Sequence, residues 1–419
     1  MLILSRRWLD GTNSHSIKRA LSVDVVRACE HEMTTGSAPS RDYDVVIVGA
    51  RCAGAATAML LARRGLRVLA IDAGRYGSDT VSTHALMRAG VFQLSRWGVL
   101  DGIKAAGTPV VQSTSVHYGD VVVGVQIKPQ NGVDGLYAPR RTVIDRLLVD
   151  AARGAGAEIT FETRLVDLVR ADNGRVSGVR LRDSHDQERQ VSAELVIGAD
   201  GVRSTVARLV GAASYRTGRH ATGVIFTYWS DTGFDAYHWY YNIGVGAGVI
   251  PTNDGHTCIF ASLPQSRFQE TMRRGADAGY RQVLRECGSG LAAIVERSKQ
   301  VEKYRGFSGE IGFFRESFGP GWALVGDAGY FKDPLTAHGI TDAFIDAELL
   351  AQAAAAGTEI AFAGYQRARD KLAVAHFEAT DAVASFDWDF PKVQQLHRAL
   401  SDAMKKESLE VANFGPSPA

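Results

Sequence analysis

A glycine-rich turn between a buried strand and a helix constrains this chain more than any other feature. Residues 44–48 form a continuous apolar run of strand length, which is typical of a strand covered on both faces in a parallel sheet. Residues 49–54 begin and end with glycine, and a helical pattern then continues to Gly65. A second apolar run, at 67–72, ends in Asp72. Together these segments predict a strand–helix–strand unit of about 30 residues.

The geometry of such a unit favours a dinucleotide. Its glycines allow a tight turn and close approach of the backbone to a pyrophosphate, and the helix N-terminus offers free N–H groups. Asp72 follows Gly49 by 72 − 49 = 23 residues, near the spacing of about 20 for a carboxylate that binds ribose hydroxyls. This acid disfavours the 2′-phosphate of NADP, so NAD or FAD is implied. Arg51 occupies the place of the middle glycine, and the pattern is therefore imperfect.

Two further aspartates each end a buried strand. Asp200, with Gly201, follows the apolar run at 195–198, and Asp327 follows the run at 322–326. Either one alone is compatible with a turn or a helix cap. Three such motifs in this order are far more specific than any one of them.

The three motifs resemble those of FAD-dependent monooxygenases of the para-hydroxybenzoate hydroxylase type, within a superfamily that includes geranylgeranyl reductases and flavin-dependent halogenases. The resemblance covers residues 43–355, and Arg141 with Asp145 resembles the family's arginine and aspartate at a helix start. It implies an α/β fold, in which a Rossmann-like FAD-binding domain with a parallel sheet is interleaved with an antiparallel-sheet substrate domain. A helical C-terminus is expected to follow.

The resemblance also implies which residues contact the cofactor. The pyrophosphate is expected at Gly49, Ala53 and Gly54, and the adenosine ribose at Asp72. Further FAD contacts are expected from Arg141, from Asp327 at the ribityl chain, with a following helix dipole favouring its ionised form, and from the backbone of Gly339 and Ile340 at the N1/C2 edge of the flavin. Asp200 and Gly201 are expected to orient the loop that meets NADH or NADPH, the transient reductant.

Patterning along the chain predicts its organisation. Residues 1–40 read as a disordered N-terminal extension, or as a segment that is not translated up to a start at Met33. The FAD-binding domain is expected to comprise 41–115, 140–215 and 305–358, the substrate domain 116–139 and 216–304, and the C-terminal helices 359–419.

Composition excludes several classes of protein. The 47 basic and 46 acidic residues give a net charge of +1, which argues against nucleic acid as a partner. The four cysteines include no closely spaced pair, so we expect no disulfide framework and no metal site, and a cytoplasmic location. No apolar run reaches the roughly 18 residues that a transmembrane segment needs. The expected partners are a small-molecule substrate and O2.

The resemblance implies a monooxygenase that uses NAD(P)H and O2 to hydroxylate or epoxidise a small aromatic or polyketide-like substrate through a flavin hydroperoxide. The stretch 333–340 keeps a second reading open, an alkene reductase of the geranylgeranyl reductase type. A flavoprotein without turnover is a third reading, suggested by Arg51. Halogenation is disfavoured because the halogenase lysine has no counterpart between Lys18 and Lys104.

Candidates for substrate contacts come from aromatic-rich strands within 222–263. Tyr228, His238 and Tyr240 carry polar tips on large apolar bodies, although ordinary sheet packing explains them equally well. His84 is the sole catalytic candidate, at the start of a helix expected over 84–97. Thr83 is the expected cap of that helix if His84 has no such role.

Overall fold

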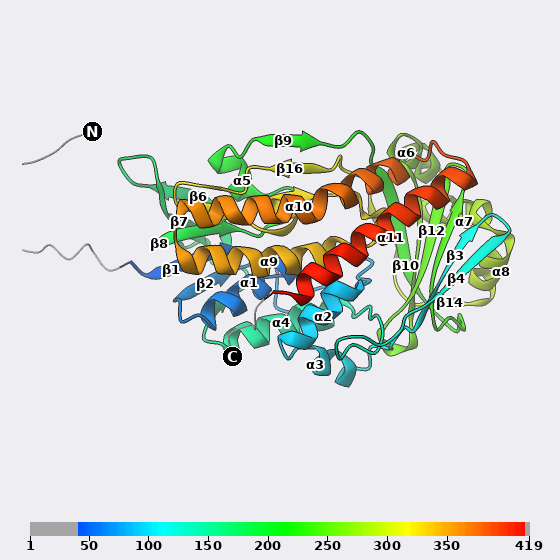
Figure 1. The fold of residues 1–419 in the computed structure, drawn as a ribbon, viewed down its shortest axis with the longest axis horizontal. Coiled ribbons are helices and arrows are strands. Elements are labelled where there is room, and N and C mark those ends of the chain that lie inside the picture. Colours follow the sequence, from blue (N-terminus) through cyan, green and yellow to red (C-terminus); the bar gives the residue numbers. More distant parts are fainter. Residues whose placement is uncertain (1–40, 415–419) are drawn as a thin grey trace, which may run out of the picture. The chain divides into compact units, whose positions relative to one another are not determined.

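The first strand, β1, lies inside a mainly parallel sheet, as its apolar sequence predicts (Figure 1). The computed structural model describes residues 41–414, so the expected extension at 1–40 and Met33 lie outside the described residues. In spatial order the sheet contains β17 (Phe318–Gly319), β18 (Trp322–Leu324), β8 (Glu188–Gly198), β1 (Tyr43–Val48), β2 (Val68–Ile71) and β5 (Glu158–Thr160). β6 (Arg164–Arg170) and β7 (Val176–Arg182) extend β8 as antiparallel strands.

Helices that are rich in small side chains cover this sheet. α1 (Cys52–Ala62) packs on α4 (Arg141–Gly154) and on α9 (Gly339–Ala356). Ala55, Ala56 and Ala58 of α1 are fully buried, because their short side chains let the neighbouring helices approach closely. The strand–helix–strand unit and the α/β class that the sequence predicts are therefore confirmed.

A second sheet, mainly antiparallel, is built from residues proposed as the substrate domain together with β3. Its order is β14 (Lys299–Gln300), β10 (Thr222–Ser230), β13 (Thr257–Pro264), β12 (Val245–Pro251), β11 (Tyr237–Asn242), β3 (Ser113–Tyr118) and β4 (Val121–Gln126). β15 (Arg305–Phe307) also pairs with β10. One face packs on the helices α6 (Gln265–Arg273), α7 (Ala276–Cys287) and α8 (Ser289–Arg297). The other face packs on the C-terminal helices.

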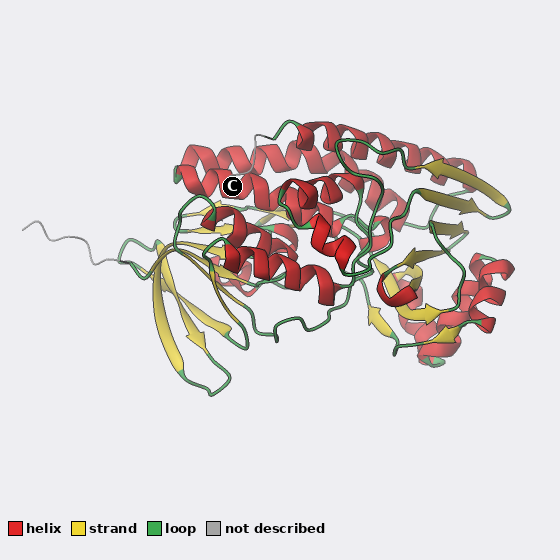
Figure 2. Cartoon of the chain, turned by 90° about the horizontal axis from the view of Figure 1, so that it is seen from below, coloured by secondary structure: helices red, strands yellow, loops and turns green. Residues whose placement is uncertain are grey.

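The C-terminal residues form two long helices, α10 (Glu359–Ala384) and α11 (Phe390–Ala412). α10 packs against both α9 and α11, and Figure 2 shows long helices of this layer side by side. Asp389 caps α11 by accepting a hydrogen bond from the backbone N–H of Lys392 at 2.8 Å. This cap fixes the direction in which α11 crosses towards α2 (Arg88–Arg96).

The remaining elements are short. They are α3 (Leu100–Ala105), α5 (Thr205–Val210), a small sheet of β9 (Ser214–Thr217), β16 (Phe313–Arg315) and β19 (Tyr330–Phe331), and 3₁₀ turns at Asn253–Gly255, Gly326–Ala328 and Pro334–Thr336. Within residues 41–414, none of the helices combines the length and the apolar character that crossing a lipid bilayer requires.

The helix expected over 84–97 begins later, at Arg88. His84 has a φ of +49°, a left-handed conformation that cannot belong to a right-handed helix. The sequence predicted an earlier start because the residues before Arg88 have the apolar spacing of a helix. In the structure these residues are buried in an irregular segment.

Candidate active site

The three sequence motifs meet at one edge of the parallel sheet. β18, β8 and β1 are neighbouring parallel strands, so their carboxyl ends, and the loops that follow them, lie together. A Cβ atom on Gly49 would lie 2.4 Å from the carbonyl oxygen of Ala199, beside Asp200. A Cβ on Gly326 would lie 3.0 Å from the Cβ of Ala53. Ligands of open α/β sheets bind at this kind of edge.

The N-terminus of α1 is built to receive an anion. Gly49 adopts a φ of +101°, and a Cβ on Gly54 would lie 1.7 Å from the carbonyl oxygen of Gly49. Only glycine fits at Gly54, so the turn keeps the backbone open to a ligand. Arg51 is the residue just before the helix, and its side chain makes no capping hydrogen bond with the helix N-terminus among the described residues. The first N–H groups of α1 therefore point out of the helix with no side chain to satisfy them.

Two guanidinium groups flank this turn. Arg51 lies 3.1 Å from Asp145, and Arg141 contacts both oxygens of the same carboxylate at 3.0–3.1 Å. The Cys52 thiol, whose pKa is raised by burial, also donates to Asp145 at 3.1 Å. Two cations against one carboxylate leave positive charge beside the helix N-terminus. Arg51 thus adds a cation to the turn, a contribution that sequence analysis recorded only as a departure from the glycine pattern.

Asp72 closes the turn from the end of β2. Its two carboxylate oxygens accept hydrogen bonds from the backbone N–H groups of Ala50 at 2.9 Å and Gly74 at 2.7 Å. A carboxylate has about four lone-pair positions, so acceptor capacity remains for ribose hydroxyls. The free N–H groups, the cations and this carboxylate fit the pyrophosphate and ribose of a dinucleotide.

Asp327 lies behind Arg141, in the turn after β18. Burial of its carboxyl group, with a smaller contribution from Asp342, raises the pKa of Asp327 to about 7, while Lys332 and Arg141 oppose this shift. Asp327 lies within a 3₁₀ turn at Gly326–Ala328, and the helix that follows begins only at Gly339. Burial rather than a helix dipole therefore decides the charge of this group.

The N-terminus of α9 is open as well. Gly339 is exposed, and a Cβ placed on it would meet no described atom within 4 Å. His338 precedes the helix and gives it no side-chain cap among residues 41–414. Free N–H groups and the positive end of the helix dipole at Gly339 and Ile340 would stabilise negative charge on a ligand here.

Asp200 has structural contacts that the sequence could not assign. Its carboxylate accepts hydrogen bonds from the N–H of Thr205 at 2.6 Å and of Val206 at 3.3 Å, and from the hydroxyl of Ser204. These bonds cap α5. Gly201 follows with a φ of +80°. A role of this loop towards NAD(P)H stays a prediction.

The structure places His84 and Tyr228 together. The ring of His84 lies 3.0 Å from the hydroxyl of Tyr228 and 3.1 Å from the carbonyl oxygen of Ala138. Arg140 stacks over the Tyr228 ring at 3.7 Å. Burial, with the charge of Arg140, lowers the pKa of His84 to about 3, so its ring is neutral at physiological pH. This cluster joins β10 of the second sheet to the irregular segments around His84 and Arg140.

We expect Tyr228→Phe to destabilise the fold without releasing FAD. The change leaves a buried nitrogen of His84 without its partner, which costs about 1–3 kcal/mol and lowers the thermal midpoint by a few degrees. Tyr76→Phe is the control, because the Tyr76 hydroxyl donates to Asp150 at the surface. Flavin absorbance and thermal melting are the measurements. Loss of FAD from Tyr228→Phe alone would place this cluster in the cofactor site.

The other two pocket candidates, His238 and Tyr240, lie on the face of β11 that turns towards His117. His238 is 3.1 Å from His117, and the Tyr240 ring stacks on His117 at 4.1 Å. Alternation along β11 directs Tyr237, Trp239 and Tyr241 to the opposite face, where they line a cavity. The period of two was visible in the sequence, but which face meets the cavity was not.

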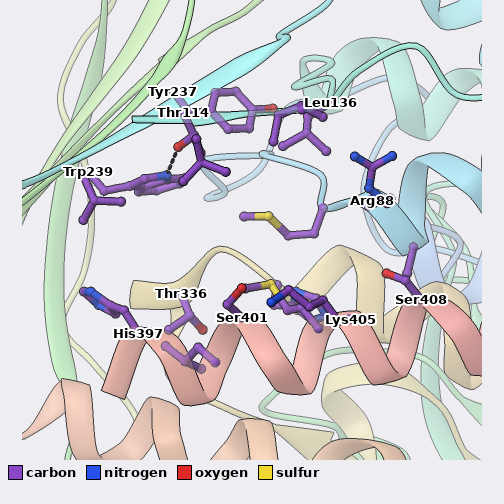
Figure 3. Close-up of a pocket in the computed structure, with 18 of the residues that line it drawn as sticks. Arg88, Thr114, Leu136, Tyr237, Trp239, Thr336, His397, Ser401, Lys405 and Ser408 are labelled. Atoms are coloured by element: carbon purple, nitrogen blue, oxygen red, sulfur yellow. Dashed lines mark hydrogen bonds between the residues drawn. The ribbon is translucent and has the colours of Figure 1, made fainter. Parts of the chain in front are cut away.

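The cavity has a volume of about 770 Å³ and lies between the second sheet and α11. Figure 3 shows Trp239, Tyr237 and Leu136 on one side and Ser401, Lys405 and Ser408 on the facing helix. Trp239 donates a hydrogen bond to Thr114 at 2.9 Å. Apolar side chains dominate the walls: Met87, Phe92, Val116, Val123, Val125, Ile127, Leu335, Leu400, Met404 and Leu409. Sequence analysis missed the contribution of α11, because nothing in a helical pattern indicates which sheet it covers.

Comparison with known proteins assigns the family. The model of a family described as FAD binding domain matches residues 42–361, and the chain belongs to this family of flavoenzymes. The monooxygenase and reductase superfamily that the three motifs resemble is thereby confirmed, and the protein is an FAD-dependent oxidoreductase.

Several curated relatives are reductases. The chain is 29% identical over 329 residues to a digeranylgeranylglycerophospholipid reductase of Methanothrix thermoacetophila, covering 75% of this chain and 79% of that protein. It is 26% identical over 323 residues to a menaquinone reductase of Mycolicibacterium smegmatis, covering 71% and 72%.

Solved structures share the fold. A flavin-dependent brominase superimposes with a TM-score of 0.76 at 18% identity, covering 89% of this chain and 94% of that one. PqsL of Pseudomonas aeruginosa, in complex with 2-aminobenzoylacetate, gives a TM-score of 0.69 at 23% identity and covers 87% and 99%.

Proposed function

We propose that this protein is an FAD-dependent reductase that adds hydrogen across a carbon–carbon double bond of a long apolar, isoprenoid-like substrate. NADH or NADPH would supply the electrons. The observation that carries the proposal is the apolar cavity between β11 and α11, whose wall includes Leu335 and Thr336 just before the open N-terminus of α9. When bound, FAD supplies hydride transfer.

The composition of the cavity supports a long apolar substrate. Small-molecule sites are mostly apolar, with a few polar groups that fix orientation, and each buried methylene group contributes about 0.8 kcal/mol to binding. The volume of about 770 Å³ lies in the upper part of the usual range of ligand sites. The names of the curated relatives agree with substrates of this kind.

The chain's own residues would bind and orient this substrate. Trp239 is held by its hydrogen bond to Thr114, so its ring forms a fixed surface at one wall. Met404 and Leu409 of α11 lie on the opposite wall and would exclude water from the reacting carbon atoms.

A monooxygenase is the second candidate, as the sequence resemblance implied. Tyr237, Trp239 and Tyr241 present three aromatic rings from one strand to the cavity, a surface that would stack against a flat aromatic substrate. In that case O2 would be a co-substrate and NAD(P)H the reductant.

A product analysis separates the two candidates. The purified protein is supplied with FAD, NADH or NADPH, and a panel of isoprenoid alkenes and aromatic compounds, with and without air. Gain of two hydrogen atoms in the product without air supports the reductase. Gain of one oxygen atom, only in air, would contradict it and support the monooxygenase.

Blocking the cavity should weaken substrate binding without removing FAD. Ser401 of α11 lines the cavity, so Ser401→Trp places a large ring where the substrate is expected. Ala399→Trp is the matched control, because Ala399 is exposed on the same helix. We expect at least a tenfold rise in KM for Ser401→Trp and none for the control. Equal kinetics in both variants would exclude this cavity as the substrate site.

A further inference from the structure

A buried histidine and a buried glutamate lie in the wall of the cavity, beside the N-terminus of α9. The Nε2 atom of His338 is 2.9 Å from both carboxylate oxygens of Glu407, which reaches it from α11. The two side chains are 0% and 4% exposed. The pair joins the residue that precedes α9 to the helix that covers the cavity.

The second ring nitrogen of His338, Nδ1, is buried and has no hydrogen-bond partner among the described residues. An orphaned polar atom of this kind is costly unless a ligand or a water satisfies it. Because Glu407 holds Nε2, the position and the tautomer of the ring are fixed, and Nδ1 is the atom left for a ligand.

Charged groups from three elements surround the pair. Asp342 of α9 lies 3.8 Å from His338 and pairs with the ammonium group of Lys332. His376 of α10 packs its ring 4.2 Å from that of His338 and lies 3.5 Å from Lys332. Burial, together with Lys332 and His338, lowers the pKa of His376, so this second ring is neutral.

His338, Asp342, His376 and Glu407 together offer donor atoms that a divalent cation accepts. The ammonium group of Lys332 already lies against Asp342 and near His376, so the cluster carries its own positive charge. This arrangement favours proton transfer over metal binding.

We propose that His338 and Glu407 form an acid–base dyad, in which Nδ1 of His338 donates a proton to the substrate in the cavity and Glu407 positions and charge-stabilises the ring. The proposal rests on the reductase function and names the proton donor for it. A carboxylate that fixes one nitrogen of a histidine while the other faces the reacting group is a recurrent arrangement in acid–base catalysis.

The step balances as follows. The Nδ1–H bond of the imidazolium breaks, and its electron pair stays on the ring. The electron pair of the alkene π bond forms a C–H bond with that proton. The second C–H bond, at the adjacent carbon, would take the hydride that bound FAD would supply after reduction by NAD(P)H. The neutral ring recovers a proton from water after the product leaves.

Another histidine of the same cavity provides a natural contrast. His397 of α11 also lines the wall, but its ring meets the hydroxyl of Tyr118 at 2.8 Å instead of a carboxylate. Burial lowers the pKa of His397 to about 4, so it carries no proton to donate near neutral pH. The matched control for His338 is His220, whose ring lies 3.2 Å from the carboxylate of Asp381 and does not line the cavity.

The test is chemical rescue of the flavin-loaded protein. We expect His338→Gly to lose about 100-fold or more of the alkene-reduction rate, the size of a general acid's contribution, and His220→Gln to lose less than about threefold. Imidazole added to His338→Gly should restore turnover, and a series of substituted imidazoles should restore it in proportion to their acidity. Imidazole should also raise the thermal midpoint of His338→Gly, but not of the wild type, by filling the space beside Glu407.

A second variant guards against a folding defect of His338→Gly. Glu407→Gln keeps the shape of the side chain and removes its charge, so we expect it to retain FAD, to lose at least tenfold of the rate, and to recover in Glu407→Asp. A rescued turnover rate that does not depend on the acidity of the substituted imidazole would contradict the proposed dyad. So would a full rate in His338→Gly, or one tightly bound divalent ion per chain that both variants lose. A wild type that reduces no alkene contradicts the reductase instead.

Discussion

Gly54→Val is expected to yield a protein that purifies without FAD. The new Cβ would lie 1.7 Å from the carbonyl oxygen of Gly49, a backbone atom that cannot move without opening the turn. The added methyl groups would also push α1 away from Gly49 and Ala199, so that its first N–H groups would no longer meet the pyrophosphate in the same geometry. We expect a loss of affinity of at least 100-fold, measured by the flavin absorbance of the purified protein and by titration with FAD.

The control for this variant is Gly154→Ala, at the end of α4. A Cβ at Gly154 would meet no described atom within 4 Å, and alanine favours a helix over glycine by about 1 kcal/mol. This variant should keep full FAD content. Circular dichroism separates loss of the cofactor from loss of the fold. A folded Gly54→Val that binds FAD normally would show that the turn is not the pyrophosphate site.

Changing Asp327 should weaken FAD binding and remove its pH dependence. Burial raises the pKa of this carboxyl group to about 7 in the flavin-free protein, whereas ribityl hydroxyls donate best to the ionised form. Wild-type affinity should therefore rise about tenfold between pH 6 and pH 8, as the carboxyl group ionises. Asp327→Asn should bind FAD ten- to hundredfold more weakly at pH 8, with no pH dependence in this window.

The carboxyl group of Asp327 should also make the stability of the flavin-free protein depend on pH. Its folded-state pKa is raised above the unfolded value of 3.8, so the neutral form favours the fold. The contribution of this carboxyl group to the free energy of unfolding is fully present below about pH 4 and is lost as pH rises through about 7. The thermal midpoint of Asp327→Asn should not show this decrease between pH 4 and pH 7. An identical melting profile in both proteins would contradict the assignment.

Asp200→Ala is the control for both measurements. It removes two hydrogen bonds to the first turn of α5, where Ser204 remains as the N-cap, so stability should fall by about 1 kcal/mol while the turn at Gly49 stays intact. We expect FAD content to remain, with slower anaerobic reduction by NAD(P)H if the loop serves the reductant. Loss of FAD in this variant would assign Asp200 to the cofactor site instead.

Local patterns predicted the elements of the cofactor site accurately. The helical sequence pattern at 141–154 corresponds to α4, and the pattern at 339–356 corresponds to α9. α4 ends at Gly154, and α9 is followed directly by Gly357. Glycine at the end of a helical pattern is a stop signal, so the sequence itself indicates where both helices end. The helical pattern over 267–300 is instead divided at Gly275, whose φ of +101° separates α6 from α7, and again at Gly288, before α8.

Contacts between distant segments could not be predicted in the same way. His84 and Tyr228 are 144 positions apart and share a hydrogen bond, and His338 and Glu407 are 69 apart. No local periodicity reports such pairs. His238 and Tyr240 were chosen for their chemistry, but the register of β11 directs them away from the cavity.

The sequence by itself determined the class of fold and the flavoenzyme family, and it predicted the turn at Gly49–Gly54, because each depends on a few residues close together in the chain whose backbone geometry only glycine or a strand-end aspartate satisfies. The tertiary structure alone showed the cavity beside α11, the burial that raises the pKa of Asp327, and the pairing of His338 with Glu407. These features depend on how α11 docks on the second sheet, and that docking is fixed by packing of the whole core rather than by any local pattern.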